Sequence, residues 1–359
     1  MPSNAPLPQF DDVLDAAARI APHVCVTPLL RADALDAAAG ARLVFKPEGL
    51  QHAGAFKFRG ACNAVAGLPG ADAARGVVTH SSGNHGAALA LAARLRGIPC
   101  HVVVPEGANR AKLDLIVAQG AIVHRCAPTL AAREARCAQV QADTGATLVH
   151  PYADPRVIAG QGTATLELLA AAPGLDVVVV PVGGGGLAAG AALALAGRSP
   201  GTALVLAEPA GAADALHALR SGRREPVPAP GTICDGLRGT LGGPGFEILR
   251  GHGASVAVVD DSDTIAAMRL LWMRLKLLVE PSSAIALAAV LQQRDRLAGR
   301  APLDRSQAGD ARGAGGVGGE AVDGVGGDHR HRARRQPRRG LPQHRAACRR
   351  CEGERRDHG

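Results

Sequence analysis

One segment of the sequence places a lone amine between two aromatic rings. The segment GAFKFRGA begins at Gly54 and holds Lys57 between Phe56 and Phe58, just before a helical pattern. An amine in apolar surroundings loses part of its preference for the charged form, which makes it a nucleophile near neutral pH. The alternative is a surface lysine whose stem packs on the protein while its charge reaches water.

A run of four glycines joins a strand pattern to a helix pattern. In VVVVPVGGGGLAAG the apolar strand pattern ends at Val182, and the helix pattern begins at Leu187. Successive glycines let backbone N–H groups close around an anion, and the following helix N-terminus adds partial positive charge. This favours a phosphate site over a flexible turn, and the absence of GxGxxG and GxxxxGK[ST] argues against a dinucleotide site or P-loop. The glycines are Gly183, Gly184, Gly185 and Gly186.

Polar side chains gather at another strand-to-helix turn, in THSSGNHGAALALAAR. Hydroxyls and main-chain donors at a helix start can hold a carboxylate, and the Asn84 amide can bond a ring hydroxyl. Capping of the helix by Ser82 or Asn84 is the simpler alternative. A nucleophilic serine triad is disfavoured because the GxSxG context is absent. The polar residues of this turn are Ser81, Ser82, Asn84 and His85.

The elements that must position these groups alternate between strand and helix from about residue 12 to 300. Such alternation is typical of βαβ units and a mostly parallel sheet. Strands are predicted at Arg42–Lys46, Gly76–Thr79, Cys100–Val104, Ala121–His124, Val177–Val182, Ala203–Ala207 and Ser255–Val259. Helices are predicted at Asp11–Ile20, Gly60–Ala66, His85–Arg96, Ala111–Gln119, Thr129–Thr144, Ile158–Ala171, Leu187–Ala196, Ala213–Arg220, Asp261–Lys276 and Ser282–Gln293.

The composition indicates a folded globular protein with an aliphatic core. Hydrophobic residues make up 47% of the 359 residues and aromatic residues only 2%, so Ala, Val, Leu and Ile must fill the core. The sequence has no export-signal pattern and no apolar run of about 20 residues, so we expect a soluble, cytoplasmic protein without membrane contact. The eight cysteines are scattered, which favours reduced thiols, and only Cys348 and Cys351 have a spacing that weakly suggests zinc.

Positive charge concentrates in the last part of the chain. The formal net charge is +8, and residues 301–359 hold 13 Arg, no Lys and 8 acidic residues. This stretch is rich in Gly and Arg and shows no helical or strand period, so we expect it to be disordered. Its charge allows a different class of function, a catalytically silent protein that binds RNA or acidic partners. No aromatic residue interrupts the tail to stack on bases, which argues against nucleic acid.

The amine, the glycine run and the polar turn together supply the contacts that a pyridoxal-phosphate enzyme acting on amino acids requires. Over about residues 10–300 the sequence resembles the threonine/serine dehydratase and serine racemase family of fold type II pyridoxal-phosphate enzymes. The family's regulatory domain is not recognisable. The motifs that carry the resemblance are TPLL at Thr27, KPEGLQ at Lys46, GAFKFRGA at Gly54, SSGNHG at Ser81, GQGT at Gly160, PVGGGGL at Pro181 and LLVEPSSA at Leu277.

The resemblance implies a fold with a division into domains. The fold would be α/β and tryptophan synthase β-like, with two α/β domains of mostly parallel sheets and a cleft between them. Residues 12–70 and 151–300 would form the large cofactor-binding domain, and residues 71–150 the small substrate-binding domain. Residues 301–359 would be a disordered or aberrant tail. The resemblance also implies a homodimer.

The resemblance further implies roles for single residues. Lys57 would carry pyridoxal 5'-phosphate as a Schiff base, and Ser82 would be a second catalytic residue, on the opposite face of the substrate. Asn84 would bond the ring oxygen of the cofactor. The cofactor-binding set is Phe56, Lys57, Asn84, Gly183, Gly184, Gly185, Gly186 and Leu187. The substrate-binding set is Ser81, Ser82, Gly83, Asn84 and His85.

The segment AEPAGAAD, which ends at Asp214, matches the divalent-cation loop of the same family. Its implied ligands are the Glu208 and Asp214 carboxylates and the Ala212 carbonyl, and such oxygen donors suit Mg²⁺, Mn²⁺ or Ca²⁺. The alternative is a turn at the end of a strand with solvated acids. One departure from the family is Ala55, where a serine is usual, a change that could loosen phosphate contacts without removing Lys57.

The activity implied is a threonine or serine dehydratase, which converts a small hydroxy amino acid to a 2-oxo acid and ammonia. Serine racemase and 3-hydroxyaspartate dehydratase are the alternatives. A late strand ending in SGGN is also expected, and no such motif follows Arg300. A tail rich in Arg, Gly, Ala and Pro is what a GC-rich gene gives when read out of frame, so a frameshift and a divergent tail are both open. Activity would then depend on this ending.

Overall fold

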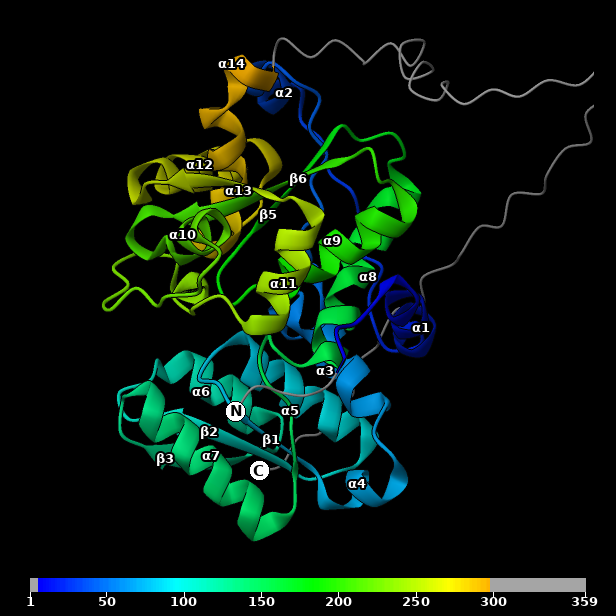
Figure 1. Ribbon diagram of the computed structural model, residues 1–359, viewed down its shortest axis with the longest axis vertical. Coiled ribbons are helices and arrows are strands. Elements are labelled where there is room, and N and C mark those ends of the chain that lie inside the picture. Colours follow the sequence, from blue (N-terminus) through cyan, green and yellow to red (C-terminus); the bar gives the residue numbers. More distant parts are fainter. Residues whose placement is uncertain (1–5, 298–359) are drawn as a thin grey trace, which may run out of the picture. The chain divides into compact units, whose positions relative to one another are not determined.

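The computed structural model describes residues 6–297, all within one compact unit that spans Met1–Leu303. Two parallel sheets and the helices around them organise this part of the chain (Figure 1), which confirms the predicted α/β class. The boundaries proposed for the large and small domains remain predictions. The predictions made for residues 301–359, including the disordered tail, the Cys348–Cys351 pair and the missing strand, lie outside the described residues. No helix within residues 6–297 has the length and apolarity needed to cross a membrane.

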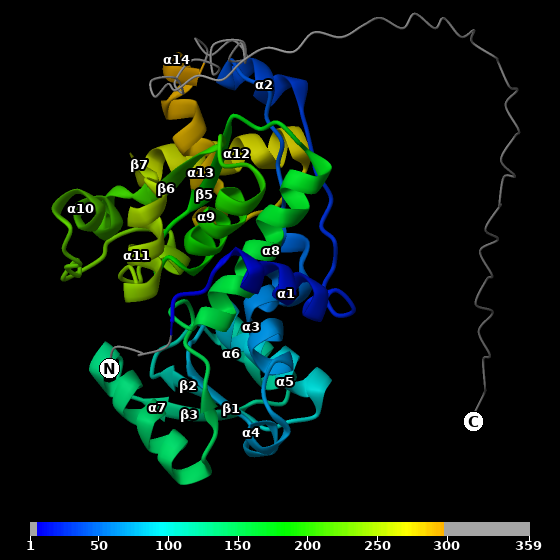
Figure 2. The same ribbon diagram turned by 45° about the vertical axis from the view of Figure 1, so that its right-hand side comes forward.

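The first sheet joins four strands in the order β3-β2-β1-β4, all paired in parallel. Their side chains alternate between two faces, so that Val77 and Val102 pack with α5 (Asn84–Arg96) while Val78 and Val103 pack with α7 (Leu130–Thr144). The two helices lie on opposite sides of the strands in Figure 2. The remaining elements here are β1 (Val77–His80), β2 (Cys100–Pro105), β3 (Ile122–Cys126), β4 (Thr147–Leu148), α4 (Gly70–Arg75) and α6 (Arg110–Ala118).

The second sheet has the order β5-β6-β7 and is also parallel. Val178 and Leu206 pack with α9 (Gly186–Arg198) and α11 (Gly243–His252), and Val205 packs on the other face with α12 (Asp261–Leu275) and α13 (Pro281–Gln292). The strands are β5 (Val177–Pro181), β6 (Ala203–Pro209) and β7 (Ser255–Val259). The other helices are α1 (Phe10–Ile20), α2 (Asp33–Ala39), α3 (Lys57–Ala66), α8 (Pro155–Ala171), α10 (Asp214–Ser221) and α14 (Arg294–Leu297), with 3-10 helices η1 (Glu48–Leu50), η2 (His52–Gly54), η3 (Ala210–Ala212) and η4 (Asp235–Leu237).

Helix α8 packs against both α3 and α9 through glycines, and Figure 1 shows the three helices side by side. A Cβ atom on Gly160 would lie 2.6 Å from the Cα of Gly60 in α3. A Cβ atom on Gly190 of α9 would lie 2.5 Å from the backbone nitrogen of Gly162. Backbone atoms cannot move aside as a flexible side chain can, so the GQGT segment needs its glycines for close helix packing.

One predicted strand is wrong, and helices α2, α4, α11 and α14 and strand β4 were not predicted. Residues 42–46 contribute only a single antiparallel bridge, from Phe45 to Leu30, because the N–H of Leu43 donates to the side chain of Asp36 (2.8 Å) instead of a strand. Helix α11 begins with Gly-Pro-Gly, which is typical of a turn. Helices α2, α4 and α14 and strand β4 are too short to show a clear period. The other predicted strands and helices are present.

Gly190→Ala should destabilise the protein by about 1–3 kcal/mol, because the new methyl group would meet backbone atoms of α8. The matched control is Gly251→Ala in α11, where no atom lies within 4 Å of the new Cβ and the better helix propensity should stabilise by up to about 1 kcal/mol. Denaturant unfolding of both variants measures the difference. Equal stability of the two variants would contradict the close-packing account.

Candidate active site

Lys57 is the first residue of α3 and follows a bend in which Ala53 and Gly54 have φ of 56° and 71°. A left-handed conformation is strained for alanine, so the surrounding structure must hold this bend in place. The Nζ of Lys57 donates a hydrogen bond to the carbonyl of Pro151 (2.9 Å) and lies 5.2 Å from the centre of the Phe56 ring. Burial lowers the pKa of Lys57 to about 8, so the amine is partly neutral at mildly alkaline pH and can act as a nucleophile.

The four glycines form the connection between β5 and α9. Gly185 has φ of 87°, and a Cβ on Gly183 would lie 2.8 Å from the Cα of Leu237. A Cβ on Gly184 would lie 2.3 Å from ring atoms of Tyr152. The first N–H groups of α9, including that of Leu187, have no partner within the helix, so this side-chain-free turn offers donors to an anion.

The polar turn lies between β1 and α5, and its side chains make different contacts. The Ser81 hydroxyl accepts hydrogen bonds from the N–H groups of Gly86 (3.2 Å) and Gly83 (3.4 Å), so it caps the start of α5. Ser82 and Gly83 are half-buried beside it. Ser81, rather than Ser82 or Asn84, therefore caps the helix.

His85 is buried in the first turn of α5, and it is close enough to Lys57 for their charges to interact. Burial, followed by the positive charge of Lys57, holds the pKa of His85 well below its usual range. Its Nε2 lies 3.3 Å from the carbonyl oxygen of Val149, so Nε2 carries the proton and Nδ1 is a bare acceptor. Nδ1 is buried and has no hydrogen-bond partner within residues 6–297. The imidazole is therefore neutral.

Asn84 is held by Glu280, a residue to which the sequence assigned no role. The Asn84 side-chain amide donates to a Glu280 carboxylate oxygen (2.9 Å) at the start of α13. Lys112 of α6 pairs with Asp235 of η4, and its Nζ lies 3.9 Å from the other oxygen of Glu280. These contacts join the two sheets' helices at the polar turn. Glu280 belongs to the motif LLVEPSSA, which was the feature of the sequence that could have indicated its role.

A group of aromatic and imidazole rings also borders the site, and sequence reasoning missed it. The His150 ring packs edge-on against Tyr152 (4.6 Å between centres) and against His80 (5.2 Å). Burial, then the neighbouring charges of His80 and Lys57, lowers the pKa of His150 to about 4. Tyr152 contacts the glycine turn, so this group connects that turn to the end of β1. The segment HPYA, which contains His150 and Tyr152, has no sequence motif that would indicate a functional role.

The predicted metal ligands lie together at the carboxyl end of β6. Glu208 is fully buried, and its carboxylate accepts the N–H groups of Ala215 (2.6 Å) and Leu216 (2.9 Å) at the start of α10. Asp214 accepts the N–H of Leu241 (2.7 Å). Burial raises the pKa of Glu208 to about 7 and also raises that of Asp214. The acids are therefore not solvated, and buried oxygen donors of this kind fit a hard cation. No group of three or more His, Cys, Asp or Glu side chains within residues 6–297 is arranged to hold a metal, and the predicted set has two plus a carbonyl.

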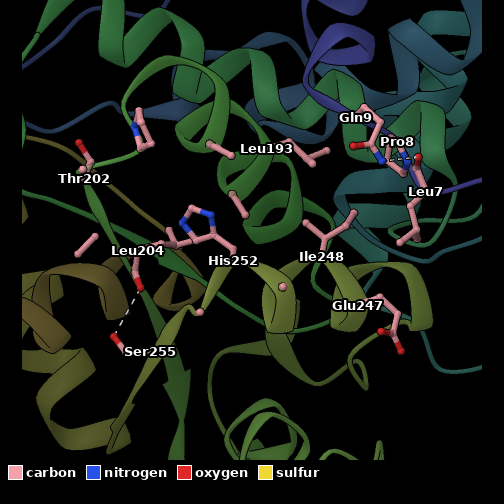
Figure 3. Close-up of a pocket in the computed structure, with 17 residues that line it drawn as sticks. Leu7, Pro8, Gln9, Leu193, Thr202, Leu204, Glu247, Ile248, His252 and Ser255 are labelled. Atoms are coloured by element: carbon pink, nitrogen blue, oxygen red, sulfur yellow. Dashed lines mark hydrogen bonds between the residues drawn. The ribbon is translucent and has the colours of Figure 1, made fainter. Parts of the chain in front are cut away.

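The structure contains two cavities near these elements. One has a volume of about 1180 Å³, with His80, His150 and Glu134 among its lining residues, so it reaches the ring group beside the site. The other has a volume of about 620 Å³ and lies between α9 and α11, where Figure 3 shows Leu193, Ile248 and His252 around it. None of the predicted site residues lines either of these two cavities.

Comparison with known proteins identifies what the chain resembles. Residues 20–303 match the family model described as "Pyridoxal-phosphate dependent enzyme". A beta-hydroxyaspartate dehydratase from Paracoccus denitrificans is 45% identical over 294 residues, which cover 82% of this chain and 93% of that protein. A serine racemase from Arabidopsis thaliana is 46% identical over 279 residues, which cover 78% of this chain and 84% of that protein.

Two solved structures also resemble this chain. The structure of maize serine racemase matches with a TM-score of 0.79 and 43% identity, covering 80% of this chain and 87% of that one. The crystal structure of a threonine deaminase from T.th. matches with a TM-score of 0.77 and 42% identity, covering 81% of this chain and 94% of that one.

Reductive labelling of the cofactor-free protein with pyridoxal phosphate and borohydride should be fast at Lys57. Only the neutral amine attacks an aldehyde, so the rate should rise with pH and level off above about 8, rather than near the value of about 10.4 of an ordinary lysine. Peptide mapping after labelling measures this, and Lys57→Ala is the control for other amines. A rate that still rises through pH 10 would contradict the effect of burial.

Proposed function

The chain belongs to the fold type II family of pyridoxal-phosphate-dependent enzymes and is of the serine racemase and dehydratase type, and we propose from its site that it dehydrates a small 3-hydroxy amino acid. The products would be a 2-oxo acid and ammonia. One observation carries the proposal: the Lys57 amine, with its pKa lowered to about 8 by burial, is held at the start of α3 by the carbonyl of Pro151. An amine in this state can serve both as the attachment point of an aldehyde and as a base.

The residues present fit this cofactor. A Cβ at any of the four glycines would crowd Leu237, Tyr152 or Leu241, so the turn stays free of side chains, as close approach of a phosphate requires. Lys57 supplies the amine for the aldehyde, and Asn84 supplies an amide for the ring oxygen. When bound, the cofactor supplies an aromatic ring that withdraws electrons from the substrate α-carbon.

Residues of the chain would transfer the proton and hold the phosphate and the substrate carboxylate. Lys57 takes the proton from the α-carbon of the substrate, a step helped by the lowered pKa of its amine. The N–H groups at the start of α9 hold the phosphate, and the donors at the start of α5 hold the substrate carboxylate. His85 remains neutral at the back of the turn because its pKa is held low, so it adds no charge that would compete for the carboxylate.

Arg133 of α7 favours 3-hydroxyaspartate as the substrate, with serine and threonine as alternatives. Its Nε is buried and has no hydrogen-bond partner within residues 6–297. Burial and then the charge of Arg133 lower the pKa of His80, while the charge of Glu134 acts in the opposite direction. Burial and then Glu134 raise the pKa of Tyr152, and the charge of Arg133 opposes that rise. The cation therefore acts on the ring group that borders the site. A guanidinium in this place suits a second carboxylate, as in hydroxyaspartate.

Racemisation is a second candidate activity, because serine racemases are among the similar proteins. Inversion at the α-carbon needs an acid or base on each face of the substrate. In this proposal Lys57 serves one face and Ser82 the other. Dehydration needs only Lys57 as the base, so the two activities can coexist.

We also propose that Glu208, Asp214 and the Ala212 carbonyl bind Mg²⁺, Mn²⁺ or Ca²⁺. The two buried carboxylates lie close enough that the charge of Asp214 contributes to the raised pKa of Glu208, after burial. A divalent cation would offset this repulsion. Through the hydrogen bond from Leu241 to Asp214, the ion would also steady the segment that packs on Gly185.

Lys57→Ala should abolish formation of both the 2-oxo acid and the D-amino acid from L-serine. The same amine would attach the cofactor and remove the proton from the substrate α-carbon. Ser82→Ala should lower the D-serine yield by about 100-fold, at the low end of general acid–base contributions, and leave pyruvate formation within about threefold. Both products are measured in one incubation by chromatography. Pyruvate formation by Lys57→Ala at the rate of the unaltered enzyme would contradict the proposed role of Lys57.

Arg133→Gln should lower kcat/KM for 3-hydroxyaspartate by about 10- to 100-fold, the effect of losing a charge-assisted hydrogen bond worth about 1.5–3 kcal/mol. The value for serine, which has no second carboxylate, should change by less than about threefold. Arg136→Gln on the exposed side of the same helix is the matched control and should leave both substrates unaffected. Equal losses on both substrates would mean that Arg133 has a structural role and does not recognise the carboxylate.

A further inference from the structure

Cys25 and His52 form a thiol–imidazole pair outside the candidate active site. The Sγ atom of Cys25 lies 3.4 Å from Nε2 of His52. Cys25 is half-buried and His52 is exposed, so a small molecule in solvent can reach the sulfur. The proposed dehydration uses neither residue.

Buried contacts hold the two side chains together. The Gln51 side chain accepts the N–H of Cys25 (3.0 Å) and donates to its carbonyl (2.7 Å), so it clamps the Cys25 backbone on both sides. The N–H of His52 donates to the same Gln51 oxygen (3.0 Å), and the His52 ring packs edge-on against the buried Phe58 ring (5.2 Å between centres). Gln51 is only 3% exposed. The pair is therefore fixed by the interior of the protein and is more than a surface approach of two mobile side chains.

The pair has the parts of an activated nucleophile. A thiolate is the reactive form of cysteine, and an adjacent imidazole with a bare nitrogen can take the thiol proton and stabilise the thiolate that remains. A third group, here the Phe58 ring, orients the base. Four of the other described cysteines are buried, and burial raises the pKa of Cys62 to about 11 and that of Cys100 to about 12. Cys126 is half-buried like Cys25 and has no hydrogen bond to an imidazole within residues 6–297.

We propose that Cys25 is a modification site that His52 activates and that exchanges with small disulfides. The thiol proton passes to Nε2 of His52, and the Cys25 sulfur attacks one sulfur of the disulfide. One S–S bond forms to Cys25 as the original S–S bond breaks, and the leaving thiolate takes the proton back from His52. The disulfide is itself the oxidant, so no further reactant is required.

The position of the pair couples it to Lys57. An adduct on Sγ occupies the space between Cys25 and His52, and His52 begins η2, the short helix that contains the strained bend at Ala53. The carbonyl of Cys25 also accepts a hydrogen bond from Arg59 (3.4 Å), two residues after Lys57. Separation of Cys25 from His52 therefore disturbs the segment that presents the amine, and modification lowers activity.

The test uses the full-length protein with its cofactor, incubated with oxidised glutathione, and mass spectrometry of each cysteine-containing peptide. Cys25 should form the mixed disulfide about tenfold faster than Cys126, and His52→Asn should reduce the Cys25 rate to that of Cys126. Labelling of Cys25 no faster than that of Cys126, or unchanged labelling in His52→Asn, would overturn the proposal. Because labelling requires no turnover, this result is independent of the proposed dehydratase activity.

Activity measurements test the coupling to Lys57. Glutathione adduct formation should lower turnover several-fold, and a dithiol reductant should restore it. Cys25→Ser should keep basal turnover and the backbone clamp while losing the inhibition, and Cys126→Ser is the matched control that should keep it. Full activity in protein modified at Cys25 would disprove the coupling, as would inhibition that persists in Cys25→Ser.

Discussion

The close contact of α8 with α3 and α9 is the constraint on which the rest of the structure depends. Lys57 begins α3 and the glycine turn leads into α9, so both chemical groups lie at the starts of helices that touch α8. The contacts run through Gly160 to Gly60 and through Gly162 to Gly190, with spacings that no side chain permits. Backbone contacts of this kind fix the axial position of each helix. The separation of the Lys57 amine and the glycine turn therefore follows from helix packing.

A buried ion-pair network adds a second constraint on Lys57. Arg59 is fully buried and donates to both Glu48 (2.7 Å) and Glu167 of α8 (2.6 Å), while Lys46 also donates to Glu167 (2.7 Å). Removing such charges from water costs several kcal/mol per ion, and only complete pairing offsets the cost. The network joins Lys46, Glu48 and Arg59 to Glu167 of α8, so it holds the segment that contains Lys57 against that helix. The amine two residues before Arg59 shares that fixed position.

The sequence predicted the parts of the site that depend on local chemistry, and it missed the parts created by packing. A glycine run, or a lysine before a helix, can be recognised from a few consecutive residues. The alternation of strands and helices is also visible in the local sequence pattern. Glu280 contacts Asn84 although 196 positions separate them, and Tyr152 lies beside Gly184 although they are on separate segments. Residues 42–46 have strand composition, yet the Asp36 side chain takes the backbone donor that a longer strand would need.

The electrostatics of the site follow from where the helices begin. Helices α3, α5 and α9 start at Lys57, Asn84 and Gly186, and each start carries the partial positive charge of its helix dipole. Burial and the nearby Lys57 hold His85 neutral, so this positive potential is available to a ligand without a competing imidazolium. Glu280 supplies the opposing negative charge at Asn84. Burial lowers the pKa of the Lys57 amine, while the helix starts around it supply positive potential that favours anionic groups.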